Sequence, residues 1–431
     1  YQDGIVSRAD ASVDLGVGMR CVVGEQTGYA YTEELTADAM LAAARTAASI
    51  ASRATGVVPP QELRHAALPH QRYAIEVPWR EVGIDRKLPI VRRCAEIASR
   101  LDPSIVKVEI SWGDGESRIL IADLNGRVVS DERPMTRLYV TVTAERDGVR
   151  QTNRANIAAR AGIDFYTEER LREVAQRAVD RTLVLFDARR PPAGEMPVVL
   201  AAGASGILLH EAIGHGMEAD FNRKRVSIYA DMLGREVAAP FVTIVDDGTL
   251  PNERGALNVD DEGEPAGRTV LVENGRLVGY MHDGISARHY GVPRTGSGRR
   301  QSFRHPPMPR MRCTYMEPGP HSRDEIVASV RRGILAETFT NGQVQIGAGD
   351  YTFYIKNGWL IEEGRLTAPI KDVNIIGTGP ETLRRITMVA DDAQLDTGGW
   401  TCGKRGQSVP VSLGIPTVLV SSLTVGGENA R

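Results

Sequence analysis

The chain has 431 residues, of which 42% are hydrophobic, and this length predicts two domains or three. Lys and Arg number 52 against 55 Asp and Glu, and a net charge of −3 excludes a general attraction to nucleic acid or anionic lipid. Four cysteines stand far apart without a CxxC pair, and no apolar run approaches the roughly 20 residues of a membrane helix, so we expect a reducing, cytoplasmic setting and no membrane partner.

Three segments of the first 190 residues carry apolar side chains at helical spacing, and each predicts a helix. They span residues 37–53, 80–101 and 167–186. Between the second and the third, two runs of alternating polarity contain Asn125-Gly126 and Asp147-Gly148, which are pairs typical of hairpin turns. This part of the chain therefore predicts an α+β domain with an antiparallel sheet.

A break follows the third predicted helix, in the segment FDARRPPAGEMP at residues 186–197. Two consecutive prolines and a glycine prevent the helix from continuing there. We therefore expect an N-terminal α+β domain over residues 1–190 and a C-terminal β-rich domain over residues 196–431.

The second domain begins with a predicted strand at 197–202 and a predicted helix at 205–221, SGILLHEAIGHGMEADF, with Ser205 as its N-cap. This helix carries His210 and His215. On a regular α-helix, residues five apart lie about 140° apart around the axis, so the two imidazoles could not reach one metal ion. A π-helical turn would bring them to one face, and the glycines on both sides of the second histidine would instead allow the helix end to unwind.

Strands dominate the rest of the second domain. Hairpin turns are predicted at Asn274-Gly275, Asn357-Gly358 and Glu363-Gly364, and an apolar run at 411–425 is the last predicted strand region. Such spacing predicts a barrel-like domain or a folded-over sheet that carries the histidine helix.

A metal site needs a third ligand, and three residues are candidates. Glu218 and Asp220 are close in sequence, and Cys402 is distant, in the segment WTCGKRGQSVP. Lysine and arginine after this cysteine favour the thiolate, which is the form that binds metal. Alternatively, the histidines are hydrogen-bonded core residues and the cysteine is a small apolar residue beside a turn; the residues alone leave the role of Cys402 open.

Six separated motifs together resemble the TldD branch of the TldD/PmbA family of metallopeptidases. They are LLHEAIGHGMEADFNRK, VDDGTLPNERG, DDEGEP, VENGRLVGYMHD, GSGRRQSFRHPPMPRM and CGKRGQSVPV. The resemblance extends from DGIVSRADASVDLGVGMR to LTVGG and implies that family sequence precedes Tyr1. It implies that His210, His215 and Cys402 hold one zinc ion per active chain and that Glu211 is the catalytic base.

The function that follows from this resemblance is a zinc-dependent peptidase. Zinc-bound water would be the nucleophile and Glu211 the general base in the hydrolysis of extended or unfolded peptides. The resemblance also implies a dimer with a PmbA/TldE-type partner subunit, or a homo-oligomer. The alternative is a non-catalytic scaffold or regulatory subunit of such a complex, and the intact HEAIGH and CGK motifs argue against it.

Four further residues in the motif-rich stretch are weaker candidates for a transition-state donor or a histidine-orienting group. They are His282, Asp283, His289 and His305. Ordinary hydrogen bonding at a surface or hairpin is the alternative for each of them.

Two charged runs complete the predictions. The basic run at 294–312 ends in a proline-rich loop, and we expect it to line a cleft, tie the domains together or contact a second subunit, and not to bind nucleic acid. The acidic run at 260–262 either pairs with this basic run or forms a solvated turn.

Overall fold

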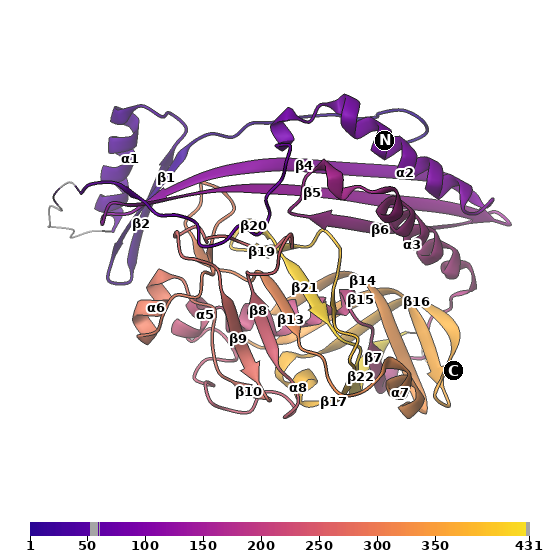
Figure 1. Cartoon of the computed structure of the whole chain (residues 1–431). Coiled ribbons are helices and arrows are strands. Elements are labelled where there is room, and N and C mark those ends of the chain that lie inside the picture. The colour runs from indigo at the N-terminus through magenta and orange to yellow at the C-terminus, as the bar shows by residue number, and fades with distance from the viewer. Residues whose placement is uncertain (52–58, 60, 428–431) are drawn as a thin grey trace.

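The computed structural model describes residues 1–51, 59 and 61–427, and its N-terminal part lies over its C-terminal part in the view of Figure 1. The N-terminal part is built on a largely antiparallel sheet. Its strands are β4 (Ile105–Ala122), β5 (Arg127–Arg146) and β6 (Val149–Ala159), with the short β3 (Arg64–His65) parallel to β5. The predicted turns at Asn125-Gly126 and Asp147-Gly148 join these strands, so both predictions are confirmed.

Two amphipathic helices, α2 (Ile84–Arg100) and α3 (Glu168–Asp187), pack against each other and against the sheet. A single apolar core lies between them and the sheet, and it includes Cys94, Val140 and Val174. The second predicted helix starts later than expected because a separate 3₁₀ turn occupies Trp79–Glu81.

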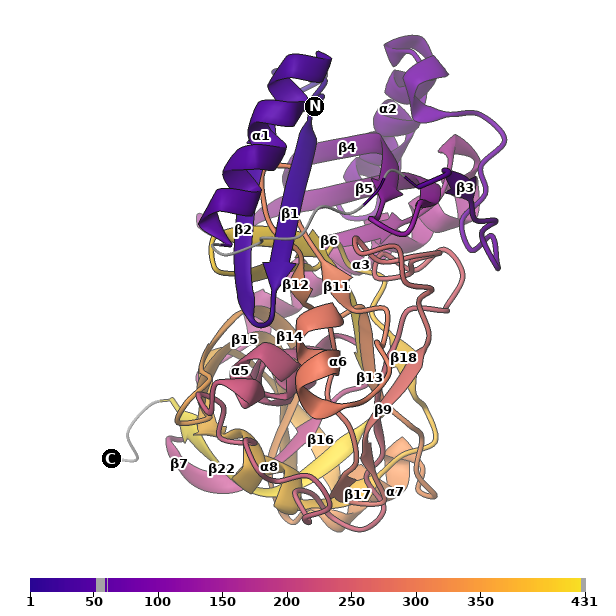
Figure 2. The ribbon, with the colours of Figure 1, turned by 90° about the vertical axis from the view of Figure 1, so that its left-hand side faces the viewer.

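A smaller unit consists of the hairpin β1 (Val17–Val23) and β2 (Gln26–Thr32) with helix α1 (Ala37–Ile50) beside it. Thr36 caps α1, because its side chain accepts a hydrogen bond from the backbone N–H of Ala39. The helix was predicted to reach residue 53; it ends at Ile50, and residues 52 and 53 lie outside the described residues. Figure 2 shows the hairpin tip pointing toward α5 (Ala219–Arg223) and α6 (Gly284–Tyr290) of the C-terminal part.

The C-terminal part contains a closed five-stranded barrel, because β16 pairs with both β15 and β22. The predicted barrel-like domain is therefore confirmed, and the whole chain is an α+β protein. The barrel strands are β7 (Gly194–Leu200), β14 (Arg332–Gln345), β15 (Asp350–Glu362), β16 (Arg365–Thr378) and β22 (Val418–Gly426), and β17 (Ile386–Val389) pairs with β22.

A second six-stranded sheet packs beside the barrel in the order β10-β9-β8-β13-β21-β18. Its strands are β8 (Ile244–Asp247), β9 (Arg268–Glu273), β10 (Arg276–Leu277), β13 (Cys313–Met316), β18 (Gln394–Leu395) and β21 (Ser412–Ile415). The short helices α6 (Gly284–Tyr290), α7 (Arg323–Ser329) and α8 (Gly379–Arg384) also belong to this part.

The C-terminal part also contains two small two-stranded ladders. One joins β11 (Gly298–Arg299) to β12 (Met308–Pro309), and the other joins β19 (Thr401–Lys404) to β20 (Gln407–Pro410). In Figure 1 the second ladder lies beneath the long strands β4 and β5.

One predicted hairpin turn is wrong. Asn357-Gly358 does not end a strand, because β15 runs through it and pairs on both sides, with β14 and with β16. A Cβ atom at Gly358 would lie 2.1 Å from the carbonyl oxygen of Leu335, so this glycine serves a close approach between strands. The other two predicted turns, at Asn274-Gly275 and Glu363-Gly364, are confirmed by positive φ at all four residues.

We propose that the two domains divide at residues 190–196, a stretch that runs from the link after α3 into the first residues of β7. None of the helices in the described part of the chain combines the length and the hydropathy that a membrane span needs.

Candidate metal centre

The segment predicted as one helix at 205–221 is a series of short turns. A 3₁₀ turn (Ala204–Gly206) leads into α4 (Ile207–Leu209), and the last part is α5 (Ala219–Arg223). Ser205 was expected to cap the helix, and this is wrong. It lies inside the 3₁₀ turn that follows Gly203, and its buried hydroxyl makes no hydrogen bond among the described residues.

Between α4 and α5 the backbone forms a π-helical turn at His210–Gly214 and then a 3₁₀ turn at His215–Met217. The π-helical turn is one of the two distortions that the spacing predicts. It brings the two imidazole rings to a centroid distance of 5.1 Å at an interplanar angle of 81°. The extra residue between the histidines is therefore absorbed without separating them.

The glycines around His215 serve packing. A Cβ atom at Gly214 would lie 2.0 Å from Sδ of Met311, and one at Gly216 would lie 2.6 Å from Cδ2 of Tyr229. Met311 and Tyr229 are both buried residues of the C-terminal core, so the π-helical turn packs directly against that core.

Strand β19 brings Cys402 to the two histidines. Potential ligand atoms of His210, His215 and Cys402 all lie within 4.8 Å of one another, and all three residues are buried. The Cys402 Sγ atom is 3.5 Å from Nε2 of His215. Among the described residues, Nδ1 of His210 is buried without a hydrogen-bond partner.

The chemistry of this donor set fits a metal ion. Burial alone raises the pKa of the Cys402 thiol, but the nearby imidazoles of His210 and His215 outweigh burial and hold that pKa well below its ordinary value. The thiolate is the form that binds metal, and two imidazoles with one thiolate suit a borderline-soft divalent ion such as Zn²⁺.

Glu218 and Asp220, the other candidates for a third ligand, are engaged elsewhere. Glu218 Oε2 accepts a hydrogen bond of 2.9 Å from Nδ1 of His215, and Asp220 Oδ1 accepts one of 2.6 Å from Nζ of Lys404. Burial raises the pKa of Glu218, but Lys404 and His215 outweigh it and lower that pKa to about 2. Glu218 is therefore an ionised carboxylate that orients a histidine, as is common around protein metal sites.

Sequence reasoning missed the contribution of Lys404. In the sequence, Lys404 contributes only to the electropositive surroundings of Cys402. The period of two in a strand places both residues on one face of β19, and this signal could have revealed the link.

Glu211 lies on the π-helical turn directly after His210 and is half-buried. In the described part of the chain no group hydrogen-bonds to its carboxylate.

Two of the four weaker candidates have structural roles on helix α6. The Asp283 side chain accepts a hydrogen bond of 2.8 Å from the backbone N–H of Ser286 and caps the helix. His289 contacts Oε1 of Glu25, in the tip of the β1–β2 hairpin, at 2.8 Å through Nδ1. Neither residue belongs to the metal-ligand cluster.

The other two histidines also lie outside the cluster. His305 Nδ1 is 3.2 Å from the hydroxyl of Ser302. His282 is buried against the rings of Tyr280 and Tyr290, and its Nδ1 atom has no hydrogen-bond partner among the described residues. Burial lowers the pKa of His282 to about 4, so the ring is neutral near pH 7.

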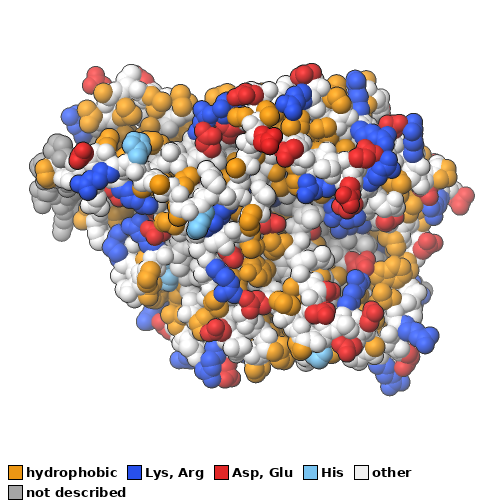
Figure 3. Space-filling view, in the orientation of Figure 1, with side chains coloured by type: hydrophobic (Ala, Val, Ile, Leu, Met, Phe, Trp, Pro, Cys, Tyr) orange, Lys and Arg blue, Asp and Glu red, His pale blue; other side chains and the backbone are white. Residues whose placement is uncertain are grey.

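The basic run at 294–312 contacts the N-terminal part, as one of its predicted roles requires: Arg300 donates a hydrogen bond of 3.0 Å to the Tyr29 hydroxyl, and Arg304 pairs with Glu33 at 2.7 Å. Arg299, Arg310 and Arg312 are buried, and the Arg310 guanidinium donates a hydrogen bond of 2.6 Å to the carbonyl oxygen of Cys402. On the face drawn in Figure 3, basic and acidic side chains are interspersed.

The acidic run at 260–262 pairs with the basic run. Asp260 Oδ2 accepts a hydrogen bond of 2.8 Å from the backbone N–H of Gly298, and Asp261 Oδ2 accepts one of 2.8 Å from that of Arg300. The alternative, a solvated turn, is wrong, because the side chains of Asp261 and Glu262 are almost fully buried.

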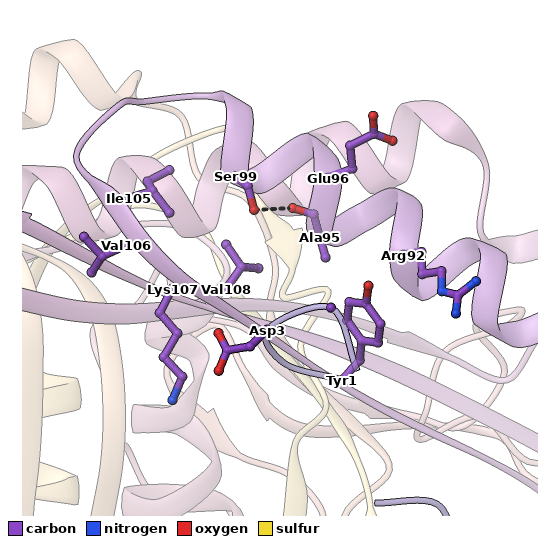
Figure 4. Close-up of a pocket in the computed structure, with 11 residues that line it drawn as sticks. Tyr1, Asp3, Arg92, Ala95, Glu96, Ser99, Ile105, Val106, Lys107 and Val108 are labelled. Carbon is purple, nitrogen blue, oxygen red and sulfur yellow. Dashed lines mark hydrogen bonds between the residues drawn. The ribbon is translucent and has the colours of Figure 1, made fainter. Parts of the chain in front are cut away.

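A surface hollow lies elsewhere, between α2, β4 and the first residues of the chain (Figure 4). Arg92, Glu96 and Lys107 are among the residues that line it. It contains none of the cluster residues and lies in the N-terminal part.

Models of all three PmbA/TldA metallopeptidase domains match the chain: domain 1 at residues 1–51, the central domain at 77–186 and the C-terminal domain at 193–427. The chain is 41% identical to the metalloprotease TldD homolog of Haemophilus influenzae, over 99% of this chain and 90% of that protein. It is 27% identical to the zinc metalloprotease TldD homolog of Saccharolobus solfataricus, over 96% of this chain and 90% of that protein.

Solved structures share the fold. A candidate DNA gyrase modulator from Thermotoga maritima aligns with a TM-score of 0.74 at 21% identity, covering 95% of this chain and 94% of that one. TldE from Thermococcus kodakarensis aligns with a TM-score of 0.69 at 19% identity, covering 95% of this chain and 89% of that one. With family models matched along the chain and a close relative over its whole length, the protein belongs to the TldD branch of the PmbA/TldD metallopeptidase family.

Proposed function

We propose that this metallopeptidase depends on zinc, with one ion per active chain held by His210, His215 and Cys402. One observation carries the proposal: two imidazoles and a thiol from segments 187 residues apart lie with their ligand atoms within 4.8 Å, in a buried place. Three protein ligands are typical of a catalytic zinc site, where a fourth position stays open. The Saccharolobus solfataricus relative is itself named a zinc metalloprotease.

Zinc, when bound, polarises a peptide carbonyl and makes water more acidic. The residues of the chain supply the proton transfers. Glu211 accepts a proton from the attacking water and passes it to the leaving amine, as a general base and then a general acid. Glu218 holds His215 with Nδ1 protonated, so that Nε2 keeps its lone pair for the metal.

The substrates we propose are extended or unfolded peptides. Strand β19 carries Cys402 and pairs only with β20 among the described strands, so one of its edges is available to an extended chain beside the ligand. Hydrogen bonds to a strand edge bind the peptide main chain without reading its side chains. Folded substrates cannot offer such a strand.

The proposed assembly is a complex with a PmbA/TldE-type partner, or a homo-oligomer. The fold shared with TldE from Thermococcus kodakarensis supports this proposal, because two chains of one fold can pair through equivalent surfaces.

The test replaces Glu211 with Gln. We expect zinc content and fold to be retained while peptide hydrolysis falls roughly 10²–10⁴-fold, because the side chain keeps its size but loses its basicity. His210→Ala is the zinc-free control, and both variants are assayed with and without a partner subunit, on one polypeptide in folded and unfolded form. Turnover equal to that of the unsubstituted chain would exclude Glu211 as the base.

Equal cleavage of the folded and the unfolded polypeptide would contradict the proposed substrate. Absence of zinc and of turnover from the unsubstituted chain would favour a scaffold.

A further inference from the structure

Strand β19 directs two buried side chains toward the histidine segment. Cys402 and Lys404 alternate with the exposed Thr401 and Gly403, so the thiol and the ammonium lie on the same face. A lysine is rarely buried unless its charge is paired. The groups that contact the Lys404 ammonium therefore show which segments strand β19 packs against.

The Lys404 ammonium reaches three oxygen atoms. It donates hydrogen bonds to Oδ1 of Asp220 at 2.6 Å and to the carbonyl oxygen of Pro309 at 3.0 Å, and it lies 3.1 Å from Oε2 of Glu218. An ammonium has three N–H donors, so each donor has an acceptor. Asp220 is 184 residues away in the sequence, which makes this a long-range connection between β19 and the histidine segment.

Glu218 continues the connection to a metal-ligand candidate. Its fully buried carboxylate accepts the hydrogen bond from Nδ1 of His215, and Nε2 of the same ring faces Sγ of Cys402 at 3.5 Å. The contacts therefore run from Lys404 through Glu218 to His215, whose ring lies beside the Cys402 thiol. Cys402 and Lys404 are both on strand β19. These contacts, together with strand β19, connect His215 and Cys402, which are two of the three candidate ligands.

We propose that Lys404 and Glu218 are positioning residues that register the Cys402 strand against His215, so that the thiol and the imidazole meet with the spacing a metal ion needs. The proposal rests on the proposed metal site. A buried ion pair by itself is weak support for stability, because the desolvation of both charges offsets their attraction. Placing ligands from distant segments is the role that this geometry explains.

The test is Lys404→Met, which keeps the length of the side chain and removes the charge. We expect zinc affinity, measured by competition with a chromophoric chelator, to fall by about 10-fold to 100-fold, as is typical when the partners of metal ligands are lost. Arg405→Met is the matched control: this neighbouring residue is 47% exposed at its side chain, 3.6 Å from Asp220 Oδ2, and we expect its effect to stay within about twofold.

Cobalt(II) separates positioning from mere stabilisation. At saturating cobalt, the thiolate-to-metal absorption band reports whether Cys402 is bound. We expect the band to be weaker or shifted in Lys404→Met and unchanged in Arg405→Met. An unchanged band in Lys404→Met overturns the proposal, whatever the zinc affinity.

Two further measurements keep the proposal decidable. If circular dichroism shows that Lys404→Met does not fold, Asp220→Asn weakens the same ammonium contact and takes the same test, with the same expected and overturning results. Zinc binding by the unsubstituted chain tests the metal site itself, so failure of the site is distinguished from failure of the positioning role.

Discussion

Cys402 reaches the two histidines from a strand 187 residues further along the chain. We predict that Cys402→Ala loses zinc about as completely as His210→Ala, because a three-ligand site that loses one member retains too few donors. Elemental analysis of the purified proteins measures this directly. Cys313→Ala is the matched control, since Cys313 is also buried but lies outside the cluster, and it should keep its zinc. Full zinc occupancy in Cys402→Ala would refute the assignment.

The buried His282 side chain leads to a second prediction, on how the free energy of unfolding depends on pH. Its pKa is about 4 in the folded chain and near 6.5 in an unfolded one, so between these values the unfolded chain binds more protons. Stability is therefore lost as the pH falls from 6.5 to 4, by about 3 kcal/mol from this residue alone.

The measurement for His282 is urea unfolding of the zinc-free protein at pH 7.5 and pH 4. His282→Phe keeps a planar ring against Tyr280 and Tyr290 and cannot titrate. Its loss of stability between the two pH values should be smaller by about 3 kcal/mol. Equal losses in the two proteins would show that His282 is not held neutral by the fold.

For single residues, the sequence predicts the three candidate metal ligands, but it does not predict the residues that position them. The HEAIGH spacing and the family motifs pointed to His210, His215 and Cys402, and the structure brings these three together. The period of two in a strand places Lys404 on the same face as Cys402, but local patterns do not show that Lys404 meets Asp220 and Glu218 across 184 residues or more.

Among the elements, the π-helical turn makes the sharpest prediction. Alanine in place of glycine normally favours a helix by about 1 kcal/mol. At Gly214 we expect the opposite sign, a loss of about 1–3 kcal/mol, because the added Cβ would lie 2.0 Å from Sδ of the buried Met311. Zinc affinity should fall as well, since relief of the clash moves the turn that carries His210 and leads directly into His215.

Urea unfolding and chelator competition measure the two effects. Gly115→Ala is the control, because a Cβ atom there would meet nothing within 4 Å, and stability should change by less than about 0.5 kcal/mol. The prediction would be wrong if Gly214→Ala left stability and zinc affinity unchanged. That result would mean that the Met311 side chain moves aside without loss of stability and that the glycine is not required.

The elements that could be predicted are those whose signal is local. The periodicity of α1, α2 and α3 and the turn residues of the β4–β5–β6 meander are contained in short segments. Asn357-Gly358 misled because the same dipeptide suits a tight turn and a close approach between strands, and only the neighbouring carbonyl of Leu335 decides between them. The helix at 205–221 broke into turns because packing against Met311 and Tyr229 outweighs helical propensity there.

For the chain as a whole, the α+β class and the barrel-like character of the C-terminal part could be predicted, and the contacts between the N-terminal and C-terminal parts could not. Barrel closure needs β16 to meet β22, and the second sheet needs β13 to lie parallel to β21. Such pairings join segments far apart in the sequence, and strand patterns do not specify partners. The β1–β2 hairpin likewise contacts the C-terminal part at Phe303 and Arg223; both lie within quoted motifs, and neither motif indicates which segment it meets.

That contact centres on Phe303 in the loop between β11 and β12. The Tyr29 hydroxyl donates a hydrogen bond of 2.5 Å to the Phe303 carbonyl oxygen, and a Cβ atom at Gly16 would lie 2.2 Å from the Phe303 ring. At the other end of the hairpin, Glu25 pairs with Arg223 at 2.6 Å. The Glu25 carboxylate is largely exposed to water, which screens its attraction to Arg223, so the aromatic contact should carry most of the docking free energy.

The last prediction follows from that contact. In Phe303→Ala we expect amide hydrogen exchange in β1 and β2 to become about tenfold faster, which corresponds to about 1.4 kcal/mol of lost docking free energy. Exchange in the barrel strands should not change, because the hairpin and α1 form a unit that can open alone. Phe241→Ala, at a phenylalanine that is 45% exposed in the C-terminal part, is the control and should leave β1 and β2 unaffected. Equal acceleration in the hairpin and the barrel would show that the chain opens as one cooperative body, and unchanged exchange in the hairpin would assign its docking to the ion pairs instead.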